Sequence, residues 1–474
     1  MTSAKANFVH LHVHTTYSLY DSTIRIDDLI EKTKEYQMPS IAITDHGNLF
    51  GAIEFYRQAK KAGIKPIIGC ELHVALGSRL DKSSACIEES PHHLVVLVKN
   101  MQGYKNLLKL TTAGYLEGFH YHPRVDKELL QRYHKGLIAT SACLQGEVAS
   151  YLLKGERDAA INAAREYQDI FGEENFYLEI MENGLPEQRI VNEGILEINR
   201  LLSIPVVATN DSHYLQAEDA EAYEVLQCIR AGKIFNDKER PRSNQFHLRS
   251  PGEMKRFFSH CSEAISNSVA IADKCNLNIE LRPSHPQQFQ LEDGIIPDED
   301  LAKIVYKGLS RMLPTIAEDF SPERRDYIIR YVTERFGIDH VAKIITFRKM
   351  RAKSAIRNVG RVLNIPYADV DAIAKMFPNA FNISLEDALN MEPRLREVAR
   401  IGERTLKLLS LSLALVGLIS HTSTNAAGMV ISEKPLVDMV PLCLDSENDL
   451  VTQYSMIDLQ NMGLSILKFF SNAR

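Results

Sequence analysis

The chain has 474 residues, of which 45% are hydrophobic and 24% charged, and its formal net charge is −6. This length exceeds what one ordinary core supports, so two to four domains are expected. No apolar run of about 18 residues is present, which excludes a transmembrane helix. The first residues resemble no secretory signal, and the seven cysteines form no CxxC pair, so a reducing cytoplasm is expected. The net charge neither indicates nor excludes DNA as a partner.

The first half of the sequence alternates short β-branched runs with helical patterns. The predicted strands are 8–14, 40–44, 66–74, 92–98, 136–140, 175–181 and 204–210. Repeated strand–helix units imply a parallel sheet, and seven strands favour a closed or nearly closed barrel. An open doubly wound sheet is the alternative, but no glycine-rich phosphate loop follows the first strand, which weakens it.

The second half is mainly helical from about residue 214 onward. A polar connector with several prolines, 281–298, predicts the first domain boundary. Residues 299–415 are predicted to be largely helical, and residues 420–455 to contain strands again.

Side chains that can bind metals recur where the predicted strands end. His10, His12 and His14 alternate along the first strand and therefore share one face. Asp21 follows in the next loop, and the other strands supply Asp45, His46, Glu71, His92, His93, Cys143, Asp211 and His213. Active sites of parallel barrels lie at the C-terminal ends of the strands. Imidazole, carboxylate and thiolate groups at one barrel mouth suit a cluster of divalent metals, which can hold a phosphodiester and activate water.

Each of these residues alone has a structural explanation. A lone histidine is usually structural, a buried free cysteine usually packs, and an aspartate at a strand end can cap the next helix. Their coincidence at almost every strand end favours the metal site. Cys143 among several histidines suits zinc, iron or manganese better than magnesium alone.

Short motifs in this region resemble a known family. HVH at 12–14, TDHG at 44–47, GCE at 69–71, SAC at 141–143 and NDSH at 210–213 look like those of the polymerase and histidinol phosphatase (PHP) family. More narrowly, residues 7–285 resemble the N-terminal PHP domain of the bacterial DNA polymerase III alpha subunit. The resemblance implies a seven-stranded βα barrel with nine ligands around two to three divalent metals. Carried over, the ligands are His12, His14, Asp21, His46, Glu71, His93, Cys143, Asp211 and His213.

The resemblance also implies a reaction. In some family members this domain is a 3′–5′ exonuclease, whereas in others the ligands are lost and the domain is structural. This chain keeps them, which favours activity. The candidate catalytic residues are Asp21, Asp45, Asp211 and His213. Arg124 is a candidate for holding a phosphate of the DNA end, and a surface ion pair with Asp126 is the alternative. His10 and His92 are expected to lie behind the ligands or to face solvent.

Beyond residue 298 the resemblance continues, but with losses in the polymerase palm. The family pattern is Pro-Asp-x-Asp-x-Asp-Phe, and residues 314–320 read PTIAEDF. The degenerate palm site consists of Thr315, Ala317, Asp319 and Phe470, the last of which stands where a third catalytic aspartate is expected. By the same resemblance, we expect the nucleotide-binding loop and the fingers to be missing. Because polymerisation needs metals held by these carboxylates, we expect no polymerase activity.

Basic residues follow this segment at helical spacing. They are Arg348, Lys349, Arg351, Lys353, Arg357 and Arg361. Lys353, Arg357 and Arg361 are candidates for contacts with the DNA backbone. A solvated helix face is the alternative.

The predicted fold is an α/β, seven-stranded PHP barrel followed by a mainly helical partial palm and thumb region. The predicted domains are the barrel with a helical extension (1–285), a partial palm (286–364), a thumb-like unit (365–418) and a truncated palm remnant (419–474). We expect a metal-dependent phosphodiesterase that acts on a DNA primer 3′ end or single strand, with other replisome subunits as partners and no membrane. The alternatives are a non-catalytic DNA- or replisome-binding remnant and a small-molecule phosphatase.

Overall fold

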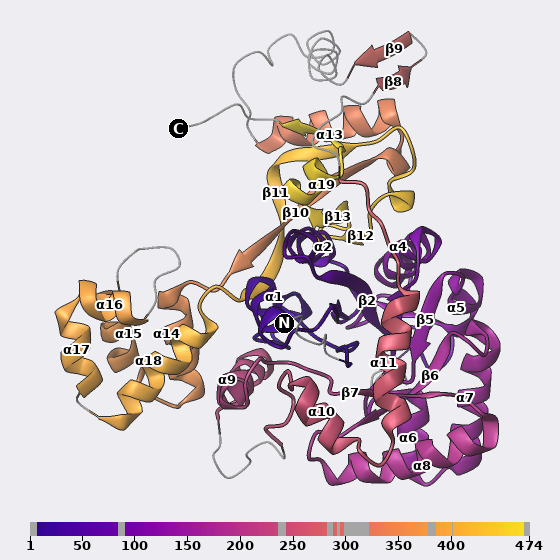
Figure 1. Cartoon of the computed structure of the whole chain (residues 1–474). Coiled ribbons are helices and arrows are strands. Elements are labelled where there is room, and N and C mark those ends of the chain that lie inside the picture. Colours follow the sequence, from indigo (N-terminus) through magenta and orange to yellow (C-terminus); the bar gives the residue numbers. More distant parts are fainter. Residues whose placement is uncertain are drawn as a thin grey trace.

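The computed structural model describes residues 7–83, 91–235, 243–281, 288–291, 294–297, 322–377, 385–400 and 402–468 (Figure 1). Their strands form a seven-stranded sheet, a five-stranded sheet and a two-stranded hairpin of β8 (Gln288–Leu291) and β9 (Gly294–Pro297). Within these ranges no helix is both long and apolar enough to cross a membrane.

The seven-stranded sheet has the order β1-β2-β3-β5-β6-β7, with β4 beside β2. Its strands are β1 (Ser40–Ile43), β2 (Lys65–Val74), β3 (His92–Val98), β4 (Arg124–Val125), β5 (Leu137–Thr140), β6 (Phe176–Met181) and β7 (Val206–Thr209). Nearly every residue in these strands is buried, as expected for a sheet that is covered on both faces.

Helices with one apolar face surround this sheet. They are α1 (Ile26–Glu35), α2 (Ala52–Lys61), α4 (Met101–Leu116), α5 (Lys127–Tyr133), α6 (Glu147–Lys154), α7 (Arg157–Phe171) and α8 (Pro186–Leu202). Three more follow: α9 (Ala220–Ala231), α10 (Pro251–Phe257) and α11 (Ser262–Lys274). Helix α10 starts at Ser250 with a capping box to Glu253, as expected from the Ser-Pro pair.

The first predicted strand closes the sheet, although it is not a regular strand. On one side, the amides of Ala42 and Thr44 donate to the carbonyls of His10 (3.0 Å) and Val13 (2.8 Å). On the other side, His14 N donates to the carbonyl of Ser212, just beyond β7, at 2.9 Å. The extended segment therefore joins β1 to β7, and the predicted barrel of seven segments is confirmed.

The prediction of an all-parallel sheet is wrong at β3. This strand runs antiparallel to both β2 and β5, and His73 is paired with His93. The sequence has no helical pattern between residues 74 and 92, and without a crossover helix the next strand returns in the opposite direction. The start of β3 consequently lies at the same rim as the C-terminal ends of its parallel neighbours.

The five-stranded sheet lies in the C-terminal part, in the order β12-β13-β10-β11-β14. Its strands are β10 (Val341–Lys349), β11 (Ile419–Ile431), β12 (Leu442–Leu444), β13 (Leu450–Ser455) and β14 (Ser465–Lys468). Helices α13 (Pro322–Phe336) and α19 (Met456–Asn461) lie beside it (Figure 1). The sheet shares one hydrophobic core with the barrel. At this junction the buried hydroxyls of Tyr104 and Tyr454 lie 2.7 Å apart.

A separate helical unit fills the chain between β10 and β11 and forms its own lobe in Figure 1. Its helices are α14 (Ala352–Val362), α15 (Tyr367–Met376), α16 (Leu385–Met391), α17 (Pro393–Arg400) and α18 (Glu403–Leu415). Together with α9 they enclose a second hydrophobic core. Arg25 ties this unit to the barrel by donating to the carbonyls of Ala414 (3.0 Å) and Val416 (2.7 Å). The predicted domain boundaries remain predictions.

Candidate metal centre

The extended segment that closes the barrel directs two histidines into its mouth. His12 and His14 are fully buried, and their Nε2 atoms lie 3.2 Å apart. The alternation of an extended chain places them on one face, as predicted. His10 shares the alternation but lies deeper, where its Nε2 is 2.7 Å from the carbonyl of Arg249.

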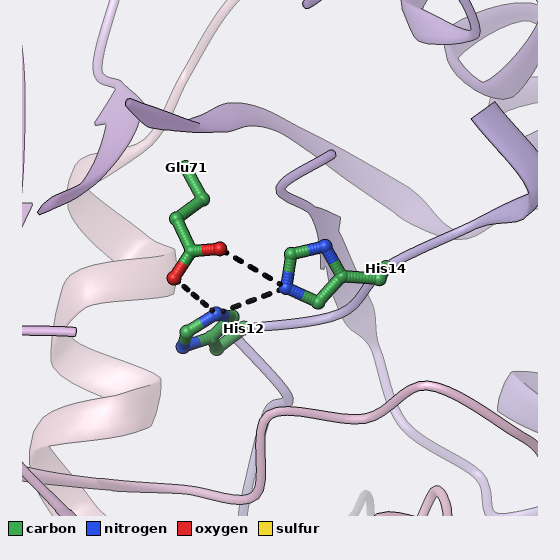
Figure 2. Close-up of side chains that lie close together, drawn as sticks. All are labelled: His12, His14 and Glu71. Carbon is green, nitrogen blue, oxygen red and sulfur yellow. Dashed lines mark hydrogen bonds and ion pairs between the residues drawn. The ribbon is translucent and has the colours of Figure 1, made fainter. Parts of the chain in front are cut away.

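Glu71 of β2 contacts four histidines of the group, and Figure 2 shows it beside two of them, His12 and His14. Its Oε1 lies 3.4 Å from His12 Nε2, and its Oε2 lies 3.5 Å from His14 Nε2. The same carboxylate reaches His46 Nδ1 at 2.7 Å and His93 Nδ1 at 3.0 Å. His93 arrives there because β3 starts at this rim.

Asp211, just beyond β7, provides a second carboxylate. Its Oδ1 lies 3.2 Å from the Nε2 atoms of His12, His14 and His213. Asp211 has a positive φ of 47°, a conformation uncommon for residues other than glycine. Strained backbone of this kind concentrates at functional sites.

Asp21 and Cys143 complete the set of nine. Asp21 Oδ2 lies 3.3 Å from His46 Nε2. Cys143 Sγ lies 3.6 Å from His93 Nδ1 and 3.8 Å from Glu71 Oε1. Three subsets have ligand atoms within 4.8 Å of one another: His12, His14 and Glu71; His14, Asp211 and His213; His46, Glu71 and His93.

Several atoms of this group form no well-directed hydrogen bond with the described residues, although they lie close to other members of the group. They include both ring nitrogens of His46, Glu71 Oε2 and Asp211 Oδ1, all of which are buried. Buried polar atoms without partners are costly, so their convergence needs an explanation. The donors are imidazole, carboxylate and thiolate, the set that divalent transition metals bind. The residues present therefore fit divalent metals.

The electrostatics of the group couple the buried carboxylates to the imidazoles around them. Burial opposes charge on Glu71, but His93 and His46 outweigh it and hold the pKa of Glu71 well below its usual range. Burial, together with His46 and His213, lowers the pKa of His14 to about 3. Glu71 is therefore ionised and His14 neutral, as metal ligands are. Burial opposes charge on His46, but Glu71 and Asp21 outweigh it and raise its pKa to about 10, so a metal at His46 would have to displace a proton.

Glu179 of β6 is a residue that sequence reasoning missed. Its Oε1 lies 2.7 Å from His12 Nδ1 and accepts a hydrogen bond from Thr209, while its Oε2 accepts one from Thr140. A carboxylate behind a ligand histidine fixes its tautomer and leaves Nε2 for the metal. The available signal was an acidic residue inside the apolar run FYLEIM.

Helix α9 contributes three further residues that were not predicted. Tyr223 Oη donates to Asp21 Oδ1 at 2.9 Å, and Gln227 Nε2 donates to the same oxygen. Arg230 reaches Asp21 Oδ2 at 2.9 Å. Their spacing of four and three residues puts them on one helix face. Nothing in the sequence connected that face with Asp21.

The predicted catalytic role of Asp45 does not fit the structure. Its carboxylate accepts hydrogen bonds from Thr15 N (2.7 Å), Thr15 Oγ1 (2.8 Å) and Ser18 Oγ (2.7 Å). It touches the histidines only indirectly, since Ser18 Oγ lies 3.1 Å from His14 Nδ1. Asp45 therefore holds the loop after the first segment in place.

The structure contradicts both alternatives considered for Arg124, the phosphate contact and the ion pair with Asp126. Its buried guanidinium donates to the carbonyls of Gly118 (3.0 Å), Arg79 (3.1 Å) and Asp81 (2.7 Å). Asp126 instead pairs with Arg79 at 3.0 Å and caps α5. Arg124 fastens two loops together because three backbone carbonyls converge on it.

His10 and His92 lie outside the nine residues, as expected, but neither faces solvent. Both are buried, and burial lowers the pKa of His10 to about 4.

The other predicted contacts lie away from the barrel mouth. Arg357 on α14 binds Asp371, with its Nε at 3.1 Å and its Nη2 at 2.9 Å from Oδ1. Lys353 and Arg361 lie on the same helix, and none of the three lines the cleft described below. Their contact with DNA stays a prediction. The degenerate palm positions Thr315, Ala317, Asp319 and Phe470 lie outside the described residues.

A cleft of about 1100 Å³ opens over the metal-capable residues. Asp21, His46, Glu71, His93, Cys143, Asp211 and His213 line it, whereas Asp45 does not. The five-stranded sheet supplies part of the opposite side through Thr422, Cys443, Leu444, Asp445, Ser446 and Asn448. A substrate at this centre would therefore contact both the barrel and the C-terminal sheet.

Comparison with known proteins gives matches to both parts of the chain. Residues 10–183 match the PHP domain, and residues 310–469 match the bacterial DNA polymerase III alpha NTPase domain. DNA polymerase III subunit alpha of Borreliella burgdorferi is 36% identical over 98% of this chain and 48% of its own length. That of Helicobacter pylori is 34% identical over 96% of this chain and 48% of its own length. The chain thus spans about half the length of the curated relatives it matches.

Among solved structures, a two-domain protein from Bacteroides vulgatus containing a predicted PHP-like metal-dependent phosphoesterase is 12% identical. The match covers 61% of this chain and 76% of that chain, with a TM-score of 0.27.

Proposed function

We propose that this chain, which carries a PHP domain and resembles bacterial DNA polymerase III alpha subunits along nearly its whole length, is a metal-dependent phosphodiesterase acting on DNA. More narrowly, we propose a 3′–5′ exonuclease. The observation that supports this proposal best is that buried imidazole, carboxylate and thiol groups converge beneath an open cleft. Several of their atoms form no well-directed hydrogen bond.

The nine gathered residues would hold two to three divalent ions, with zinc, manganese or iron favoured over magnesium by the nitrogen and sulfur donors. Bound metals would stabilise negative charge on a phosphodiester and supply an activated water. The chain's own groups position this chemistry. Glu179 orients His12, and Tyr223, Gln227 and Arg230 orient Asp21.

Proton transfer requires a group that reaches the substrate. Asp21, Asp211 and His213 line the cleft, whereas Asp45 is occupied by Thr15 and Ser18. We propose that one of the first three accepts the proton.

Polymerase activity is proposed to be absent. The support is in the sequence, where Thr315 and Ala317 occupy positions of palm aspartates and Phe470 that of a third. Threonine, alanine and phenylalanine cannot replace carboxylates as ligands for the two metals of nucleotidyl transfer. DNA and other replisome proteins in the cytoplasm are the proposed partners.

The test is to follow a 5′-labelled primer on a template in manganese, with and without deoxynucleotides, using His12→Ala as the matched inactive variant. Shortening of the primer that disappears in His12→Ala is the expected result. Elongation with deoxynucleotides would contradict the loss of polymerase activity. An intact primer in every lane would favour a non-catalytic DNA- or partner-binding protein.

A further inference from the structure

One side of the cleft is an aromatic wall, defined by Tyr115, Phe119, Tyr121 and His122. Phe119 is 47% exposed and Tyr121 is 71% exposed, and the rings of Tyr115 and Phe119 are stacked with centroids 6.1 Å apart. The proposed hydrolysis uses none of these residues. Exposed aromatic side chains gathered in a cleft mark a binding surface.

The wall is held in a fixed shape. Arg124 binds the carbonyl of Gly118 at its start and the carbonyls of Arg79 and Asp81 on the neighbouring loop. His120 N donates to the carbonyl of His122 at 3.1 Å, and Tyr121 has a positive φ of 60°. The two exposed rings are therefore displayed on a preorganised loop, which lowers the entropy lost on binding.

The wall adjoins the metal-capable group. The His122 ring stacks on His73 with centroids 4.7 Å apart, and the His73 ring lies 5.1 Å from that of His93. The cleft is also lined by the ammonium of Lys82 and by the guanidinium of Arg230, which is already paired with Asp21. Flat rings, cations and the proposed phosphodiester centre thus border the same space.

We infer that Phe119 and Tyr121 stack on the bases of an unpaired nucleic-acid end, whose terminal phosphodiester reaches the group around Glu71. This inference rests on the proposed function and specifies its substrate as a strand with its bases unstacked from a duplex. Every base offers a π-face, so the wall binds single strands with little sequence preference. A small phosphate monoester would leave both rings uncovered.

The experiment compares two strands that differ only in their bases. One is a fluorescein-labelled oligothymidylate, and the other has the same backbone with abasic residues at its last three 3′ positions. Binding is measured in a chelator, so that no hydrolysis occurs, and 3′ hydrolysis is measured separately in manganese. The proteins are the full chain and its Phe119→Ala and Tyr121→Ala variants.

Each alanine variant is expected to lose about tenfold in affinity and in kcat/KM on the thymidylate strand. On the abasic strand the same variants should equal the unaltered chain within about twofold. Tyr121→Phe keeps the ring and should restore binding. Tyr367→Ala removes an equally exposed tyrosine (72%) that does not line the cleft, and it should change nothing.

Equal losses on both strands, or no loss on the thymidylate strand, would overturn the aromatic wall as a base-binding surface. Failure of the proposed function looks different. In that case no strand is hydrolysed, while the base-dependent loss of binding in the chelator persists and supports the wall by itself.

Discussion

Two groups of metal-capable side chains, one in the barrel and one in the C-terminal sheet, differ in what surrounds their carboxylates. In each, ligand atoms lie within 4.8 Å of one another. In the barrel, the buried carboxylates of Glu71 and Asp211 face imidazoles and keep atoms without hydrogen bonds. In the loop after β12, the carboxylates of Asp445, Glu447 and Asp449 surround the ammonium of Lys343.

The difference teaches that a cluster of acids predicts a metal only when nothing in the protein already balances its charge. Lys343 Nζ lies 3.3 Å from both Asp445 and Glu447 and also contacts Asp449. Burial opposes charge on Lys343, but Asp449 and Asp445 outweigh it and raise its pKa. The loop therefore carries its own permanent cation, whereas the barrel carboxylates face imidazoles, which can give up a proton and take a metal in its place.

The largest expected effect comes from Glu71→Gln, because Glu71 belongs to two of the three barrel subsets. We expect loss of bound metal and about a thousandfold lower kcat/KM for diester hydrolysis, since metals contribute several kcal/mol to transition-state stabilisation. Elemental analysis and rates on a labelled strand measure both. Glu193→Gln serves as the control, because the Glu193 side chain is exposed and does not line the cleft. Full metal content in Glu71→Gln would refute the assignment.

A smaller loss is expected for Glu179→Gln. The amide still fits between Thr140 and Thr209 but no longer presents a charged acceptor to His12 Nδ1. Metal affinity should fall by about 10- to 100-fold. Competition against a fluorescent chelator gives this number. An affinity equal to that of the unaltered chain would show that Glu179 only packs against His12.

Lys343→Met should turn the loop into a cation site. Its side chain is only 11% exposed, and removing it leaves three carboxylates facing one another. We expect the free energy of unfolding to fall by about 1–2 kcal/mol at low salt. Calcium, which prefers oxygen ligands, should restore it in the variant and leave the unaltered chain unchanged. Urea unfolding of both proteins with and without calcium measures this effect. Equal stabilisation of both proteins would contradict the claim that Lys343 takes the place of a cation in this loop.

The smallest effect is expected for Asp449→Asn. The Asp449 side chain is 50% exposed, so loss of its ion pair with Lys343 should cost less than about 1 kcal/mol. Metal content measured on the same preparation should not change, because the barrel group is intact. A drop in bound metal would place an ion in the loop after all.

Much of the barrel was predictable from the sequence. Alternation fixed the shared face of His12 and His14, and recurrent strand ends brought Glu71, Asp211 and His213 to one mouth. The direction of β3 was predicted wrongly as parallel, although the missing helical pattern before it was visible in the sequence.

The wrong assignments share one physical cause. Whether a polar side chain faces a cleft or the backbone depends on loops that periodicity does not describe. Arg124 turned toward three carbonyls, and Asp45 toward Thr15 and Ser18. Glu179 lies in a predicted strand, but its contact with His12 Nδ1 depends on how the neighbouring strands are arranged, which the sequence pattern does not show.

Helix α9 belongs to two parts of the molecule at once. One face holds Asp21 through Tyr223 and Arg230, and another packs Val225 and Leu226 into the core of the helical unit. The helical unit therefore cannot rotate against the barrel without either moving Asp21 or separating from α9. If a ligand moves this unit together with α9, and therefore moves Asp21, thermodynamic reciprocity requires that it change the affinity of any ion held there, and that ion binding change the ligand's affinity by the same factor.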